Sequence, residues 1–248
     1  MINVEIEIFV KEDGICKVED ESKRSEVVSA GMDIVLNRML KITNIFSELR
    51  KEATWYLTGK SKKEAMEKVV ISNGAISEKG NALICQNVMS DFPLIVAQTW
   101  NSYDDLILCQ NYIQSDLCNF SYSLDFSFDN EAQMSSLMSQ LINNIINNIS
   151  PVTFRVETNS YSLLQNNVFP DRLPVGWIFY TNKVHNKKLS GLKGNMHIIT
   201  KDDEPIGTLF LSKKGFFDGS NKEDIKAAND LEIMLVSHDI LPTYRNIF

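Results

Sequence analysis

The 248-residue sequence lacks several features that would point to a membrane or a secretory route. It contains no run of about 20 apolar residues, the length that a membrane-spanning helix requires. Its N-terminus, MINVEIEIFV, alternates carboxylates with apolar residues and has neither the basic region nor the continuous apolar region of a signal peptide. These absences predict a protein that is not embedded in a membrane and that stays in the cytoplasm.

Cysteine and histidine are scarce and scattered. The four cysteines form no Cys-x-x-Cys pair and have no histidine nearby, so we expect free thiols and no metal site. The chain also lacks His-Glu-x-x-His, Gly-x-Ser-x-Gly and Walker motifs. We therefore expect no enzyme and no cofactor; the alternative is a small-molecule hydrolase or transferase whose cysteine and histidine meet only in the folded chain. The residues concerned are Cys16, Cys85, Cys109, Cys118, His185, His197 and His238.

Basic residues are outnumbered by acidic ones. Lysine and arginine total 25 against 32 aspartate and glutamate, which gives a formal net charge of −7 and a sequence pI of about 5.1. Because binding to phosphates requires a basic surface, nucleic acid is not expected as the direct ligand. The charge instead fits a basic protein partner.

Hydrophobic periodicity in the first half predicts a strand, a long helix and further strands. Residues 2–10 alternate as a strand, with Glu5 and Glu7 on a face that we expect to be exposed to water. From Ser25 to Leu49, apolar residues recur with the 4-3-4-3 spacing of an amphipathic helix, for which packing on a sheet is favoured over a coiled coil. Next come a strand at 55–57, a capped helix from Ser61 to Lys68, a loop at 72–79 and strands at 92–100, 105–113 and 118–128.

The second half shows a similar order of elements. Asp129 is expected to cap a long helix whose apolar face runs from Met134 to Ile149. Its opposite face carries four asparagines, which are weaker helix formers than alanine, so the helix needs packing for its stability. These asparagines are Asn143, Asn144, Asn147 and Asn148. Strands are predicted at 152–160, 175–182, 195–200 and 206–212, with the last two paired across a turn at 202–205.

This order of elements predicts an α+β fold. We expect a mostly antiparallel sheet with long helices packed on one face. Two similar α+β halves, residues 1–128 and 129–248, are predicted, although the two halves could share one continuous core. With 44% hydrophobic residues, a chain of this length can bury a core without disulfides.

The stretch from Pro205 to Pro242 gives the clearest local pattern. Residues 207–212 alternate as a strand, and Gly215 and Gly219 end it. Ser220 and Glu223 have the spacing of a capping box for the helix that follows. The buried face is expected to contain Ile225, Ala228, Leu231 and Leu235, with Lys222, Asp224, Lys226 and Asp230 turned away from it.

Three segments together resemble the immunity protein 52 family. The C-terminal segment contains Gly207-Thr208, Phe217-Asp218, Ala228-Asn229, Leu231-Glu232 and Leu241-Pro242, in the family's order of strand, turn, helix and Leu-Pro end. Two upstream segments agree: Trp55-Tyr56-Leu57-Thr58-Gly59 followed by Ser61, Glu64 and Ala65, and Val175-Gly176-Trp177 at the start of a strand. The motifs that carry this resemblance are structural in character.

The resemblance implies a bacterial antitoxin. Members of the family bind and neutralise a co-encoded polymorphic toxin, as in type VI secretion systems, and the toxin is often a nuclease of restriction-endonuclease fold. It therefore implies a cognate toxin as partner, here a basic DNase, with inhibition by occlusion and without catalysis.

Exposed acidic clusters are the candidate partner-binding residues. Carboxylates in loops and turns can pair with the basic cleft of a nuclease and accelerate association. The alternative is that the toxin is occluded elsewhere through apolar residues near Phe216 and Phe217. The three tryptophans, Trp55, Trp100 and Trp177, are expected in the core, with an interface role for one of them as the alternative. The acidic candidates are Glu19, Asp20, Glu21, Asp104, Asp105, Asp202, Asp203 and Glu204.

Overall fold

The computed structural model describes residues 1–11, 24–47, 50, 53–91, 96–113, 116–185, 189 and 195–248. These residues form two compact units, and each unit contains segments that are distant in sequence. Unit 1 comprises Met1–Phe9, Asp125–Gln140 and Pro151–Phe248, and unit 2 comprises Val10–Leu124 and Leu141–Ser150. The division of the chain at residue 129 into two similar halves stays a prediction.

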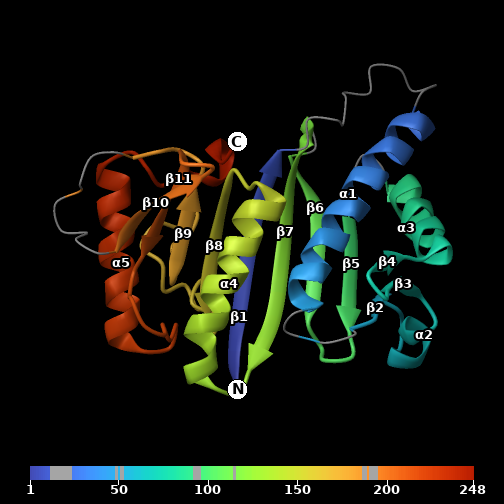
Figure 1. The fold of residues 1–248 in the computed structure, drawn as a ribbon, viewed down its shortest axis with the longest axis horizontal. Coiled ribbons are helices and arrows are strands. Elements are labelled where there is room, and N and C mark those ends of the chain that lie inside the picture. Colours follow the sequence, from blue (N-terminus) through green and yellow to red (C-terminus); the bar gives the residue numbers. More distant parts are fainter. Residues whose placement is uncertain are drawn as a thin grey trace. The chain divides into compact units, whose positions relative to one another are not determined.

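Helices separate short runs of strands along the described residues (Figure 1). The helices are α1 (Arg24–Ser47), α2 (Lys62–Met66), α3 (Glu78–Asp91), α4 (Glu131–Ile149), α5 (Lys222–Ser237) and a 3-10 helix (Tyr244–Asn246). The strands are β1 (Ile2–Lys11), β2 (Trp55–Leu57), β3 (Val69–Ser72), β4 (Ala75–Ile76), β5 (Val96–Asn101), β6 (Leu106–Ile113), β7 (Asp116–Phe128), β8 (Thr153–Thr158), β9 (Ile178–Thr181), β10 (Met196–Lys201) and β11 (Glu204–Leu211).

The strands hydrogen-bond in the order β10-β11-β9-β8-β1-β7-β6-β5-β2-β3-β4. The pairings β1–β8, β8–β9, β9–β11 and β10–β11 are antiparallel, and so are β2–β3, β2–β5, β3–β4 and β5–β6. This confirms the predicted mixture of helices with a largely antiparallel sheet. The packing of the long helices on one face stays a prediction.

The two long helices carry their predicted apolar residues inward. On α1, the side chains of Met32, Val35, Met39 and Ile42 are buried. On α4, Met134, Met138, Leu141, Ile145 and Ile149 are buried. In the part of the chain that the structure describes, no helix is long and apolar enough to cross a membrane.

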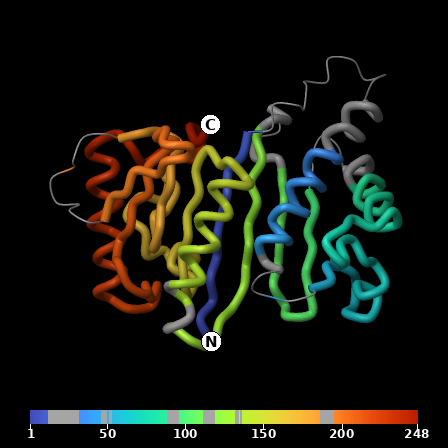
Figure 2. Tube along the Cα trace, in the orientation of Figure 1, coloured from blue at the N-terminus to red at the C-terminus, as the bar shows by residue number. Residues whose placement is uncertain are grey.

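In unit 1, the first strand lies beside a strand from the second half of the chain (Figure 2). β1 pairs with β8 so that Ile6 lies opposite Val156 and both side chains are buried. On the other face of this strand pair, Glu7 lies opposite Arg155. The expectation of a water-exposed face is wrong for Glu7, whose side chain is only 16% exposed, whereas the Glu5 side chain is 35% exposed.

Arg155 explains why acidic residues can be covered on this face. Its guanidinium donates to Glu5 at 2.7 Å, to Glu7 at 2.9 Å and also to Glu157. Both Arg155 and Glu157 are buried, and burial raises the pKa of Glu157 while the attraction of Arg155 opposes this rise. A buried arginine must be paired, so the carboxylates of β1 fold inward to satisfy it.

Helix α5 belongs to unit 1, and its first turn is not capped by the predicted capping box. The N-cap is Asn221, whose side chain accepts from the backbone N–H groups of Glu223 and Asp224, whereas Ser220 donates its hydroxyl to Asp218. Asp224 does not turn away from the core: it is buried and pairs with Lys213 at 2.7 Å.

Of the predicted apolar face of α5, Ala228, Leu231 and Leu235 are buried. Glu232 lies among them and is also buried, although nothing in the apolar pattern indicated this. It accepts from the backbone N–H groups of Val168 and Val175 and from the Tyr161 hydroxyl. A carboxylate supplied with this many donors can be buried at a tolerable cost, so Glu232 joins α5 to the loop that follows β8.

In unit 2, residues 72–79 do not form the predicted loop. Asn73 and Gly74 have positive φ angles of 51° and 70° and make a tight turn between β3 and β4, after which α3 begins at Glu78. Asn-Gly is typical of two-residue hairpins, since both residues tolerate this conformation. The chain therefore contains a hairpin and a helix that the periodicity did not predict.

Candidate protein-binding surface

An aromatic pair lies on the half-exposed face of the β2–β5 strand pair in unit 2. Tyr56 lies opposite Trp100 in the antiparallel register, and their ring centroids are 5.4 Å apart. The neighbouring residues Trp55 and Thr99 point to the opposite, buried face. Strand alternation thus places one tryptophan of the segment in the core and leaves Trp100 half-buried.

The Trp100 ring is fixed in place by its polar atom. Its indole N–H donates to the backbone carbonyl of Leu57 at 3.3 Å. A large aromatic side chain with a satisfied N–H and a partner ring loses little further conformational freedom when it is covered by another protein.

The turn between β5 and β6 is built around Asn101. The buried Asn101 side chain accepts from the backbone N–H groups of Tyr103 and Asp105, and its amide donates to the Asp105 carboxylate at 2.9 Å. Asp104 has a positive φ of 62°, a conformation that aspartate tolerates better than most residues. The turn is therefore held by side-chain hydrogen bonds and projects Tyr103 and Asp104 into solvent, at 50% and 81% exposure.

Asp105 supports the structure of the turn, and the prediction that its side chain is exposed is wrong. The residue is fully buried and receives two hydrogen bonds from Arg50, at 3.0 and 3.3 Å. The Arg50 guanidinium lies 5.2 Å from the centre of the Tyr103 ring. Asp105 therefore orients Arg50, and Arg50 in turn supports Tyr103 through a cation–π contact.

Helix α2 places a second cation over the aromatic pair. Ser61 accepts from the Glu64 backbone N–H as predicted, and the Glu64 carboxylate accepts from the backbone N–H of Lys60. A hydrogen bond from Lys68 lowers the pKa of Glu64. With the helix start fixed, the Lys62 ammonium lies 5.5 Å from the Trp100 ring centre and 3.8 Å from Asp104.

We call these side chains the Trp100 surface: Arg50, Tyr56, Lys62, Trp100, Tyr103 and Asp104. It combines partly exposed aromatic rings with cations and one exposed carboxylate, and the turn and the helix cap hold it in shape. Tryptophan, tyrosine and arginine are the residues most enriched at the energetic centres of protein–protein interfaces. The arrangement can recognise a protein surface by aromatic burial and paired charges, and it provides no nucleophile with an adjacent base.

The other predicted acidic residues lie apart from this surface in sequence. Asp202, Asp203 and Glu204 are exposed at the β10–β11 hairpin of unit 1. The turn is shorter than the predicted 202–205: it consists of Asp202 and Asp203, both with positive φ angles, and β11 begins at Glu204. Glu19, Asp20 and Glu21 lie outside the described residues.

Histidine and cysteine side chains are dispersed among the described residues. His185 is half-buried, its Nε2 atom makes no hydrogen bond there, and burial lowers its pKa. His197 and His238 are exposed. Cys85 is half-buried, Cys109 is buried, and the described residues contain no group of three or more His, Cys, Asp or Glu side chains that could hold a metal ion.

Sequence reasoning identified Asp104 in this surface but missed four of its members. The missing residues are Arg50, Tyr56, Lys62 and Tyr103. The pairing of Tyr56 with Trp100 depends on strand register, which local periodicity does not give. The sequence signal that was present is Tyr103 beside an Asp-Asp turn, because an aromatic residue at a turn has no apolar face to occupy.

No family model matches the chain, and no curated protein matches it either. Among solved structures, the chain is similar to the Pseudomonas aeruginosa T6SS protein PA0821. The TM-score is 0.45 at 8% sequence identity, and the alignment covers 93% of this chain and 76% of that chain.

Proposed function

We propose that this chain is an immunity protein that binds a cognate toxin and neutralises it by occlusion, using the Trp100 surface as part of its interface. The observation that carries the proposal is the composition of that surface, with two tyrosines and a tryptophan supported by two cations and held by a fixed turn. Interfaces with such anchors have a small number of residues that dominate the binding energy.

The three sequence segments that resemble the immunity protein 52 family support the same proposal. One of them, Trp55 to Ala65, contributes Tyr56 and Lys62 to the Trp100 surface. We further propose that the toxin belongs to a type VI secretion system and is a basic DNase of restriction-endonuclease-like fold. The two proteins would bind each other in the cytoplasm. The net charge of −7 supports a basic partner. Occlusion needs no catalytic group in this chain.

Co-expression tests the function. The gene product encoded next to this chain is expressed with and without it, and growth and co-purification are measured. We expect the neighbouring product to arrest growth alone, and this protein to restore growth and co-purify with it. If the neighbouring product is toxic and this protein neither protects nor binds, the immunity function is wrong.

Alanine variants test the surface separately from the function. Trp100→Ala and Tyr103→Ala should each weaken binding by about 30-fold or more, the loss typical of an interface hot spot. Leu163→Ala is the matched control, because Leu163 is a large apolar residue that is 78% exposed on unit 1. Circular dichroism and thermal unfolding check that the variants fold. If folded Trp100→Ala and Tyr103→Ala bind as tightly as wild type, the toxin contacts another surface.

A further inference from the structure

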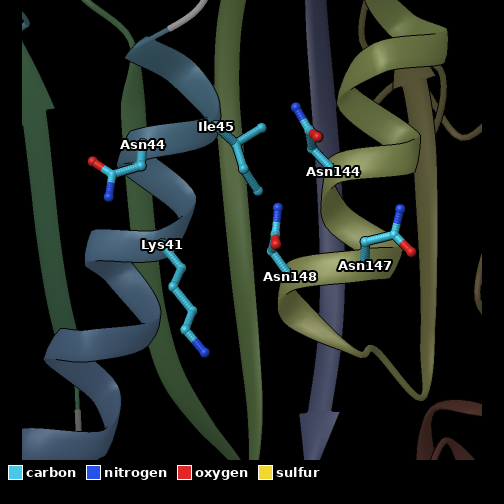
Figure 3. A pocket seen from close by; sticks show the side chains of 6 residues that line it. All are labelled: Lys41, Asn44, Ile45, Asn144, Asn147 and Asn148. Carbon is cyan, nitrogen blue, oxygen red and sulfur yellow. The ribbon is translucent and has the colours of Figure 1, made fainter.

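A polar groove of about 420 Å³ lies between α1 and α4 in unit 2. Figure 3 shows the side chains that line it, most of which are amides. Two of these residues, Asn44 and Asn144, already interact with other groups of the chain, so the groove does not indicate a ligand. The outer edge of β10 in unit 1 differs, because no strand or bridge of the described residues pairs with it.

Strand β10 is one of the two terminal strands in the order of the sheet. The other terminal strand, β4, has only two residues. A very short edge strand presents few backbone groups to another chain, and natural proteins use such strands to prevent association. β10 has six residues, so its length does not protect it in this way.

The hydrogen bonds of the β10–β11 hairpin show which backbone groups face outward. The Leu211 N–H donates to the Asn195 carbonyl at 2.8 Å, so the backbone of Asn195 faces β11. Residues that face the same neighbour alternate along an antiparallel strand, and therefore His197 and Ile199 also face β11. The backbone N–H and C=O groups of the intervening residues consequently point to the outer edge. These residues are Met196, Ile198 and Thr200.

β10 also lacks the other devices that block strand pairing, which include prolines, bulges and charges along the edge. The strand contains no proline, and its single lysine, Lys201, is its last residue. The register shift of the hairpin adds Ile206 on the β11 side and leaves β10 unbroken. All six residues of β10 are at least partly exposed, and Ile198 is 44% exposed. The edge is therefore accessible to a further strand.

We propose that β10 pairs with β10 of a second copy of this chain, antiparallel and centred on Ile198. A two-fold dimer brings the same patch of both copies together, so every contact occurs twice. In this register Ile198 lies opposite Ile198 of the second copy, and Met196 lies opposite Thr200 on both sides. Any other centre places at least one of the three outward-facing residues opposite a position beyond the strand. The proposed register therefore uses all of the outward backbone groups.

The positions of the charges favour a second copy as the occupant. Two chains of net charge −7 repel each other unless they meet where like charges are kept apart. Asp202 follows the strand four residues from the proposed centre, so the two copies of Asp202 lie about 27 Å apart at 3.4 Å per residue. This distance exceeds a Debye length of about 8 Å, and Lys201 faces the uncharged Asn195 of the second copy. The inference does not depend on the proposed antitoxin function.

Sedimentation velocity of the full-length protein over a concentration series tests the pairing. We expect a monomer–dimer equilibrium. Ile198→Lys places two like charges opposite each other at the centre and removes an apolar contact, so it should weaken dimerisation about tenfold or more. Ile233→Lys is the matched control, because Ile233 is 51% exposed on α5 of the same unit, and it should leave the dimer within about twofold of wild type. Circular dichroism checks that both variants fold.

Cysteine cross-linking tests the register. Directly opposite residues of a hydrogen-bonded pair have Cα atoms about 5.5 Å apart, which a disulfide can span. Ile198→Cys should therefore give a covalent dimer on mild oxidation, as non-reducing electrophoresis would show. His197→Cys lies diagonal to its own copy, about 7 to 8 Å away, and should cross-link no more than wild type. The inference is overturned if the wild-type protein is monomeric at every concentration, if Ile233→Lys weakens dimerisation as much as Ile198→Lys, or if His197→Cys cross-links as readily as Ile198→Cys.

Discussion

At the scale of single residues, Asp125 shows how neighbouring charges set the stability of unit 1. Its carboxyl belongs to β7 and faces the carboxylates of Glu5, Glu7 and Glu157, with Arg155 as the opposing cation. Although the residue is exposed at the surface, neighbouring atoms displace part of the water around its carboxyl, and this desolvation together with repulsion from Glu5 raises the pKa of Asp125 to about 6. Between about pH 4 and pH 6, Asp125 is therefore protonated in the folded protein, whereas in the unfolded chain, where its pKa is about 3.9, it has lost its proton.

Stability should accordingly depend on pH through this residue. The stabilisation from the bound proton is complete below about pH 4 and is lost as the pH rises through about 6. Asp125→Asn cannot ionise, so its free energy of unfolding should rise relative to wild type between pH 4.5 and 7.5. Urea unfolding at a series of pH values measures this difference. Asp203→Asn, at an exposed turn, serves as control, and a pH-independent difference for Asp125→Asn would contradict the assignment.

The acidic residues also mark the limit of residue-level prediction. Asp104 and Asp105 are adjacent in a turn, yet one is exposed and the other is fully buried against Arg50. The exposure of Asp202 and Asp203 was predictable because the residues of a tight hairpin turn project away from the sheet and into solvent. The burial of Asp105 was not, because the cation that stabilises it comes from a segment 55 residues earlier in the chain.

At the scale of elements, the start of α5 gives a direct comparison of two adjacent residues. Asn221 accepts from two backbone N–H groups of the first turn, whereas Ser220 bonds only to Asp218 outside the helix. Asn221→Ala should lower the free energy of unfolding by about 1 kcal/mol through loss of the cap. Ser220→Ala should cost less than about 0.5 kcal/mol. Denaturant unfolding measures both values, and the reverse order would show that Ser220 is the cap.

Elements with strong periodicity were predictable, and short ones were not. The helices α1 and α4 lie close to their expected ranges because each buries one continuous apolar face, and the strands β8 to β11 also lie close to theirs. The β3–β4 hairpin and α3 were missed. Strand β4 has two residues, too few for a period, and α3 has a weak apolar pattern, so its position depends on packing against β3 and α1. The Asn73-Gly74 pair was the available signal for the hairpin.

At the scale of the whole molecule, the net charge of −7 and the exposed β10–β11 turn should govern how fast a basic partner associates. Exposed charges are screened beyond a Debye length of about 8 Å at physiological ionic strength, so the association rate with the neighbouring gene product should fall as salt rises. Dissociation should change less, because it is controlled by desolvated contacts such as those proposed for Trp100.

Neutralising the three acidic residues at the β10–β11 turn measures how much they contribute to the association rate and to its salt dependence. Combined replacement of Asp202 and Asp203 by asparagine and of Glu204 by glutamine should lower both the association rate and its salt dependence, as stopped-flow binding would measure. A variant with Asp171, Asp230 and Asp239 replaced by asparagine removes the same three charges and controls for net charge, since these residues are exposed elsewhere on unit 1. An association rate indifferent to salt would exclude the electrostatic mechanism. Of the two residues named for the competing apolar contact, Phe217 is fully buried, so Phe216 is the one that a partner could reach.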